Sequence, residues 1–224
     1  MTTMLDRQVT TVPEAARVLR IPPTTLRTWL DGAEHVGRRF EPVLREKPTG
    51  SNLVTWGEMV EARYLRAYRA AVSMQRLRPF LAHMREEFGV PYPLAHFRPF
   101  VDASRDLVFR LQEEADLPDE LWMVYRGRAD QLRLSPTVVN DFLHQIDFAD
   151  AGAFEALRIR PAGPDSPVLI DPAIHSAAPS VLGVRTARLA ERAEGFGQTP
   201  EELAREFAMD VADVKAAIAY EFAA

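Results

Sequence analysis

The chain has 224 residues, of which 47% are hydrophobic and 26% charged, a balance typical of a folded globular protein. It contains no cysteine, which excludes disulfides, cysteine-ligated zinc, iron–sulfur clusters and thiol nucleophiles together. The net charge of −5 is unevenly spread, because residues 1–90 carry 14 Lys and Arg against 10 Asp and Glu whereas residues 91–224 carry 13 against 22, so the two parts can face different partners.

The first predicted element is a helix over residues 12–19. Thr11 and Glu14 have the spacing of a capping box, in which each side chain binds the other residue's backbone amide. Apolar residues recur at helical spacing at Val12, Ala15, Ala16 and Leu19. A helix of two turns is not stable alone, so it must dock on a neighbour.

A second helix is predicted to begin at Pro23, because the amide that proline lacks has no partner at a first helical position. Ile21 and Leu26 have the spacing of a hydrophobic staple. The expected buried face consists of Leu26, Trp29 and Leu30. The side chains left outside are Thr24, Arg27 and Thr28.

A β-hairpin or wing is predicted between Gly37 and Trp56. Its strands are expected around Val43–Leu44 and Leu53–Val54, on either side of a basic turn that contains proline and glycine. A further capping box at Thr55 and Glu58 then opens a helix of about four turns.

The next helix is expected to be capped by Ser73 and to extend to Phe88, where Gly89 and Pro91 end it. Pro79 is expected either to kink this helix or to delay its start.

The middle of the chain predicts a mixture of strands and helix. We expect a hairpin formed by residues 98–102 and 107–111, a strand over residues 131–134, and a helix from Ser135 to Ile146. The segment PAGPDSP at residues 161–167 is predicted to be a loop or linker.

The last segment predicts a short strand at residues 168–170 and then three helices. The first helix is expected at about residues 185–194, and a third capping box at Thr199 and Glu202 opens the second. Asp210 is expected to cap the last helix. Its predicted apolar stripe consists of Val211, Val214, Ile218 and Phe222.

The predicted fold class is mainly α with small β elements, α+β. We expect a winged helix-turn-helix with its following helices at residues 1–90, a small α+β region at residues 91–163, and a helical domain at residues 164–224. The two helix–turn–helix-like ends are the nearest approach to an internal repeat.

A short helix, a tight turn and a second helix with polar residues at its start is the geometry that places a recognition helix in the DNA major groove. Small polar residues suit base edges, and arginine and lysine suit phosphates. The candidate DNA contacts are Arg17, Arg20, Thr24, Thr25, Arg27, Thr28, Arg38, Arg39, Arg45 and Lys47. The alternative is a helical hairpin for protein contact, with a solvated arginine-rich face.

Residues 11–30 resemble the N-terminal winged helix of MerR-type regulators, whose second helix ends in Leu-Arg-x-Trp/Tyr. Leu26, Arg27 and Trp29 match that ending. In that family the arginine at the Arg27 position touches the DNA backbone. The sequence departs from the family in having Pro22 and Pro23 where serines are common, and in lacking the long coiled-coil helix and the effector domain.

The C-terminal segment resembles a small domain associated with bacterial antitoxins. The matching residues are Asp171, Pro172, Pro179, Gly183, Arg185, Glu201, Glu202, Ala217 and Tyr220, and the departures are Ala177 and Val184. The order of the two parts resembles larger VapB-like antitoxins of type II toxin–antitoxin pairs.

This resemblance implies a non-enzymatic protein that sequesters a PIN-type ribonuclease toxin and represses its own operon by binding operator DNA. PIN toxins cluster carboxylates around divalent metal, and arginine pairs well with carboxylates. Arg185 and Arg188 are therefore candidate toxin contacts. The alternative for Arg185, which we favour, is a structural role, as a cap or in an internal pairing with Asp171.

Two other functions compete with this one. Carboxylate chemistry at Asp147, Asp150, Glu155, Asp165 and Asp171 lacks any recognisable spacing, so no catalytic residues are predicted. A stand-alone MerR-like transcriptional regulator without a toxin partner remains the alternative to an antitoxin.

No cofactor or metal is expected, since the five histidines lack the spacing of a helical metal pair. The sequence has no membrane-length apolar run and no signal peptide, so a cytoplasmic protein is expected. Because palindromic operators are read by symmetric dimers, we also expect a homodimer.

Overall fold

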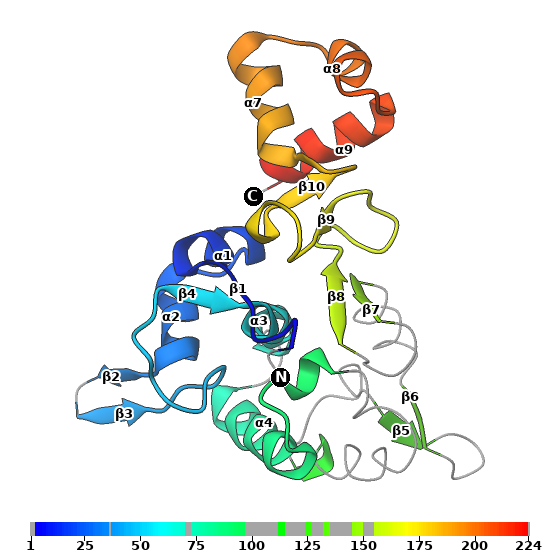
Figure 1. Cartoon of the computed structure of the whole chain (residues 1–224). Coiled ribbons are helices and arrows are strands. Elements are labelled where there is room, and N and C mark those ends of the chain that lie inside the picture. Colours follow the sequence, from blue (N-terminus) through cyan, green and yellow to red (C-terminus); the bar gives the residue numbers. More distant parts are fainter. Residues whose placement is uncertain are drawn as a thin grey trace. The chain divides into compact units, whose positions relative to one another are not determined.

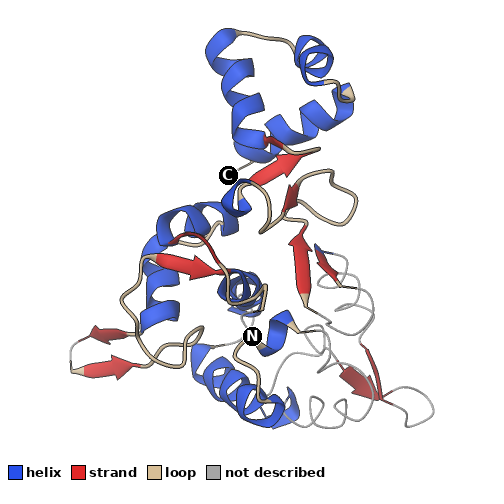
Figure 2. Ribbon diagram, viewed as in Figure 1, coloured by secondary structure: helices blue, strands red, loops and turns tan. Residues whose placement is uncertain are grey.

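The computed structural model describes residues 3–35, 37–69, 73–96, 112–114, 124–126, 132–134, 145–149 and 155–223. The chain divides into two compact units. The N-terminal unit is Met1–Leu143 with Phe148–Ala156, and the C-terminal unit is His144–Asp147 with Leu157–Ala224. Helices and small sheets occur in both units, so the α+β class is confirmed (Figure 2). The predicted division at residues 90 and 163 stays a prediction.

The N-terminal unit starts with a strand that the sequence did not predict. Strand β1 (Gln8–Thr11) pairs antiparallel with β4 (Leu53–Thr55). Helix α1 (Val12–Leu19) follows directly, with its first amide donating to Asn52 O at 2.8 Å. The predicted helix bounds are therefore confirmed, and a strand pairing sets where the helix begins.

The capping box predicted at Thr11 is wrong. The Thr11 side chain makes no cap hydrogen bond. Glu14 pairs instead with Arg17 of the next turn, at 2.7 Å between Oε1 and Nη2. The start of α1 relies on the pairing of β1 with β4, which local spacing could not show.

Helix α2 (Pro23–Asp31) confirms the predicted helix and its buried face. Leu26, Trp29 and Leu30 are all buried, as is Ile21 in the turn before the helix. The turn itself depends on Arg20, whose φ of 55° lies in the left-handed region. Helices α1 and α2 pack against each other, and α1 lies beside β1 and β4 (Figure 1).

The predicted hairpin is wrong: the strand expected at Leu53–Val54 is β4, which pairs with β1, and a different hairpin lies earlier in the chain. Strand β2 (Ala33–His35) pairs with β3 (Arg38–Phe40), whereas Val43 and Leu44 belong to no strand. Their amides donate to Trp29 O at 2.8 and 2.9 Å, and both side chains are buried. Val43 and Leu44 therefore pack at the end of α2. This packing, and not a strand, accounts for the two apolar residues in this loop.

Helix α3 (Trp56–Arg69) opens with the predicted capping box. Glu58 N donates to Thr55 Oγ1 at 3.2 Å, and Thr55 N donates to Glu58 Oε2 at 2.8 Å. Trp56 is fully buried, and its Nε1 donates to Ala156 O at 2.6 Å. This bond ties α3 to Ala156, a residue of the same unit that lies far along the chain.

Helix α4 (Met74–Phe88) contains Pro79 within its length and ends at Gly89, so the predicted bounds are confirmed. Ser73 occupies the N-cap position, but its side chain makes no cap hydrogen bond, which corrects the predicted role. A short 3₁₀ helix, η1 (Pro93–Ala95), follows.

In the middle region, β5 (Val124–Arg126) pairs with β6 (Leu132–Leu134), which confirms a strand at the predicted place. The hairpin predicted at residues 98–111 and most of the helix predicted from Ser135 lie outside the described residues. Ile146 was assigned wrongly to that helix, because it begins strand β7 (Ile146–Phe148).

The C-terminal unit contains a sheet in the order β11-β10-β9-β8-β7. Its remaining strands are β8 (Ala156–Ile159), β9 (Leu169–Ile170), β10 (Pro179–Val181) and β11 (Val184–Arg185). The predicted loop at residues 161–167 lies between β8 and β9 and is confirmed, as is the predicted strand that follows it.

Three helices follow: α7 (Thr186–Phe196), α8 (Pro200–Phe207) and α9 (Val211–Phe222). Helices α7 and α9 pack against β10, and α8 packs against these two helices. Their shared core consists of Val168, Val181, Leu189, Leu203, Ala204, Val214, Ala217 and Tyr220. The capping box at Thr199 and Glu202 is present. Two details are corrected: the Asp210 side chain makes no cap hydrogen bond, and Phe222 is 51% exposed.

Among the described residues, no helix combines the length and the apolar character needed to cross a bilayer.

Candidate nucleic-acid interface

The first turn of α2 contains two backbone amides, those of Thr24 and Thr25, that can donate a hydrogen bond to a ligand. Pro22 is the N-cap and Pro23 the first helical residue, and neither has an N–H. The first helical hydrogen bond runs from Leu26 N to Pro22 O at 3.0 Å, so the amides of Thr24 and Thr25 precede it. This turn contains no acidic residue. A helix end of this kind attracts anions, because its amides and the helix dipole are positive.

Arg27 and Thr28 lie further along α2. Arg27 is exposed, and its Nη2 donates to Asn52 Oδ1 at 3.0 Å. The Thr28 hydroxyl donates to Thr24 O at 2.9 Å, which occupies that hydroxyl within the helix. Asn52 O also accepts the first amide of α1, so Asn52 links the start of α1 to the middle of α2. Sequence reasoning missed Asn52 because its partners are distant along the chain.

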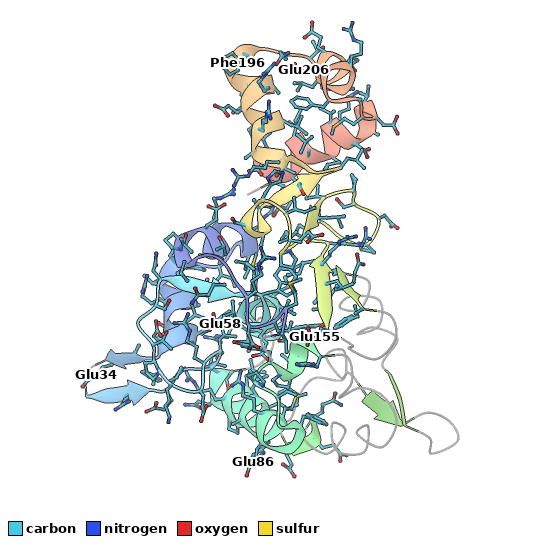
Figure 3. All side chains as sticks on the ribbon, in the orientation of Figure 1. Glu34, Glu58, Glu86, Glu155, Phe196 and Glu206 are labelled. Atoms are coloured by element: carbon cyan, nitrogen blue, oxygen red, sulfur yellow. The ribbon has the colours of Figure 1, made fainter. Side chains whose placement is uncertain are left out.

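The hairpin β2–β3 carries exposed charge. The Arg39 side chain is 73% exposed and pairs with Glu41 at 2.9 Å. Glu34 lies opposite Arg39 in the strand register and stands at the outer end of the hairpin in Figure 3. Arg38 is in β3, but its side chain lies outside the description. The hairpin therefore presents both signs of charge, with Phe40 partly exposed beside them.

Arg45 has an internal role rather than an exposed one. It is buried, and its Nε donates to Glu58 Oε1 at 2.7 Å while its Nη1 donates to Asp31 Oδ1 at 2.8 Å. It also donates to Thr49 Oγ1 at 2.7 Å and to Leu53 O at 2.8 Å. This guanidinium joins the end of α2, the loop before β4 and the start of α3, so we exclude Arg45 from the candidate DNA contacts.

The surroundings of Asp31 favour its charged form. Burial alone would raise the pKa of Asp31, but hydrogen bonds from the amides of Thr49 and Gly50 and from Arg45 outweigh it and lower that pKa. In the same way, burial opposes the charge of Arg45, and its bonds to Glu58 and Asp31 raise its pKa overall. The network is therefore an ionic clamp on the end of α2.

The remaining predicted contacts lie at the end of α1 and on the loop after the hairpin. Arg17 is half-exposed beside Glu14. Arg20 is exposed at the left-handed end of α1, and Lys47 is exposed on the loop that follows the hairpin. The structure thus places Arg17, Arg20, Thr24 and Arg27 on one helix pair, with Arg39 on the adjoining hairpin.

The two candidate toxin contacts lie in the C-terminal unit. Arg185 is exposed at the N-cap of α7, and Arg188 is exposed with its guanidinium carbon 5.1 Å from the centre of the Phe207 ring. The internal pairing of Arg185 with Asp171 is wrong. Asp171 binds Arg158 at 2.8 Å and accepts the amide of Ala173 at 2.8 Å.

The chain is similar to two proteins and to a solved structure from Mycobacterium tuberculosis. Uncharacterized protein Rv2308 is 32% identical over 98% of this chain and 92% of that protein. "Putative antitoxin VapB45" is 33% identical over 75% of this chain and 74% of that protein. The crystal structure of Rv2018 superposes with a TM-score of 0.71 and 27% identity, covering 96% of this chain and 100% of the other. No family model matches the chain.

Proposed function

Because the chain belongs to the family of "Putative antitoxin VapB45", we propose that it is the antitoxin of a type II toxin–antitoxin pair. Its toxin would be a PIN-type ribonuclease, which it neutralises by direct binding. It would also repress its own operon by binding operator DNA as a homodimer. In this role the chain is a regulator and not an enzyme.

One observation carries the DNA-binding half of this proposal. The first turn of α2 has no acidic side chain, and it combines available amides with the exposed side chains of Thr24 and Arg27. Phosphate contacts from amides, hydroxyls and arginines fix a protein on a duplex. Small hydroxyl side chains at the start of a groove-lying helix can then reach base edges.

The supporting contacts make this surface rigid. Asn52 positions Arg27 through a 3.0 Å hydrogen bond, and the Arg45 clamp fixes the other end of α2. A rigid helix loses little conformational freedom on binding, which favours affinity. Arg17, Arg20, Arg39 and Lys47 would contact flanking phosphates.

The toxin-binding half rests on the family membership and on the C-terminal unit. Arg185 and Arg188 are exposed near the start of α7, where they can pair with carboxylates. Residues 157–224 of the C-terminal unit carry 7 Lys and Arg against 10 Asp and Glu, a balance unsuited to DNA. The two activities would therefore use different units.

The test is to co-express the chain with the ribonuclease encoded by the adjoining gene and to measure co-purification, ribonuclease inhibition and binding to the DNA upstream of the operon. We expect a stable complex that is inactive as a ribonuclease and that binds the upstream DNA. Specific DNA binding without any toxin complex would identify the alternative, a stand-alone regulator. Loss of both activities would refute the proposal.

A further inference from the structure

Two exposed apolar side chains lie at one edge of the C-terminal unit. Leu182, in the turn between β10 and β11, is 72% exposed, and Ile174, in the loop after β9, is 37% exposed. His175 Nε2 lies 2.7 Å from Gly183 O, within hydrogen-bonding distance. This contact joins the neighbours of Leu182 and Ile174, so the loop and the turn form one edge.

The turn that presents Leu182 is strained. Leu182 and Gly183 have φ values of 48° and 79°, the left-handed pair required by a two-residue hairpin turn. Asparagine, aspartate or glycine suits the first position, whereas the Cβ of leucine is crowded there. The Leu182 side chain stays mostly exposed, so burial of apolar surface does not offset this crowding. Folding alone would therefore favour another residue at this position.

The loop that faces the turn is strained as well. His175, Ser176 and Ala177 form the 3₁₀ segment η5 with φ values of 50°, 55° and 58°. Consecutive left-handed residues other than glycine are uncommon. Such strain, held in place by the surrounding structure, gathers at binding and switch sites. Two strained segments therefore hold two apolar side chains toward solvent.

The stretch of chain that forms this edge is positively charged, and Glu221 of α9 accepts the Thr186 hydroxyl beside it at 2.5 Å. The stretch from Pro172 to Ala190 contains Arg185, Arg188 and His175 but no aspartate or glutamate. The first turn of α7 begins here, also without an acidic residue, so the helix dipole adds positive potential. A partner that fits this edge has an apolar recess bordered by carboxylates.

We propose that the docking edge, defined as Ile174, His175, Leu182, Arg185 and Arg188, binds the ribonuclease toxin directly. Leu182 and Ile174 fill an apolar recess, and the two arginines pair with carboxylates at its border. His175 acts as a positioning residue that holds the loop against the turn. This inference rests on the proposed function, because it takes the toxin as the partner.

The decisive variant is Leu182→Asn, since asparagine suits the left-handed backbone while removing the apolar contact. In the full chain we expect a melting temperature no lower than that of wild type and a toxin affinity about 10- to 100-fold weaker, as for a buried interface anchor. Ile174→Ser should weaken toxin binding to a lesser degree. The matched control is Phe196→Ser, which removes a 71% exposed aromatic ring at the other end of α7 and should leave affinity unchanged.

Binding is measured by calorimetry with the purified ribonuclease of the adjoining gene, and affinity for the upstream DNA is measured in parallel. Wild-type binding with loss in Leu182→Asn and unchanged DNA affinity supports the docking edge. Wild-type binding that persists in both Leu182→Asn and Ile174→Ser refutes the edge and leaves the proposed function intact. If the wild-type chain fails to bind the ribonuclease, both proposals fall together.

Discussion

In two helix pairs of the chain, α1–α2 and α8–α9, the first helix has eight residues, follows a threonine N-cap and ends in a left-handed residue other than glycine. That residue is Arg20 in the first pair and Ala208 in the second, with φ values of 55° and 52°. In both pairs the amide that follows bonds back to the first helix. The two turns are therefore built in the same way.

The surfaces of the two pairs differ in charge. The first turn of α2 has no acidic residue, whereas Glu201 and Glu202 lie in the first turn of α8 and Asp213 in that of α9. Under the proposed function, DNA would be attracted to the first surface and repelled by the second. Backbone shape alone thus does not identify a DNA-binding helix pair, and the side chains on the outer face decide which partner it suits.

The two pairs are also stabilised by different means. The buried Arg45 clamp joins α2 of the first pair to α3, whereas a capping box opens α8 of the second pair and the partly exposed pair Arg192–Glu206 joins α8 to α7 (Figure 3). Each difference can be tested by matched substitutions.

The largest expected effect is that of Arg45→Met. It leaves the buried carboxylates of Asp31 and Glu58 without their cation, which should lower the free energy of unfolding by about 3–5 kcal/mol. Urea denaturation of the full chain measures the loss. The control is Arg192→Met at the partly exposed pair, where a loss of at most about 1 kcal/mol is expected. Equal losses would contradict the distinction between the two pairs.

The second-largest expected effect is on the affinity for DNA. Replacing both Arg27 and Arg39 by alanine should weaken binding to the upstream DNA about 10- to 100-fold. The salt dependence should fall by roughly 0.9 log unit of affinity per log unit of salt for each phosphate that the variant no longer neutralises. Fluorescence anisotropy at several salt concentrations measures both quantities, and toxin binding should be unaffected.

The matched variant on the second helix pair replaces Arg205 and Lys215 by alanine. Like the Arg27 and Arg39 variant, it removes two positive charges, but from the acidic surface of α8–α9. DNA affinity should therefore change by less than about twofold. A loss as large as that of the Arg27 and Arg39 variant would show that α8–α9 also contacts DNA.

A smaller effect is expected from the helix caps. Thr199→Ala removes a capping box and should cost about 1 kcal/mol of unfolding free energy. Thr11→Ala should cost less than about 0.5 kcal/mol, because the Thr11 side chain makes no cap hydrogen bond. Thermal unfolding compares the two variants. A reversed order would mean that Thr11 caps α1 after all.

The smallest effect tests the turn of the second pair. Ala208→Gly relieves the left-handed backbone and should stabilise the chain by about 0.5 kcal/mol, after the added freedom of the unfolded chain is subtracted. Ala212→Gly, on the exposed face of α9, should instead destabilise it by about 0.5–1 kcal/mol. Differential scanning calorimetry distinguishes these opposite signs.

Local sequence patterns were sufficient for most of the helices. Apolar spacing predicted α1 and α2 and their buried faces, and the capping boxes at Thr55 and Thr199 are present as predicted. These features depend on residues three or four positions apart, which a helix brings together whatever surrounds it. The positive charge of the N-terminal part is likewise a property of the sequence itself.

Contacts between distant segments decided the features that local sequence patterns did not predict. Thr11 became the end of a strand because β4 pairs with it, and Val43 and Leu44 became a seal on α2 because Trp29 O accepts their amides. Arg45 has the same chemistry as the exposed arginines, yet Asp31 and Glu58 make it a buried clamp. The sequence by itself determined which residues form helices, since that information is local. Only the folded chain determined which cations face solvent, because burial depends on contacts between distant segments.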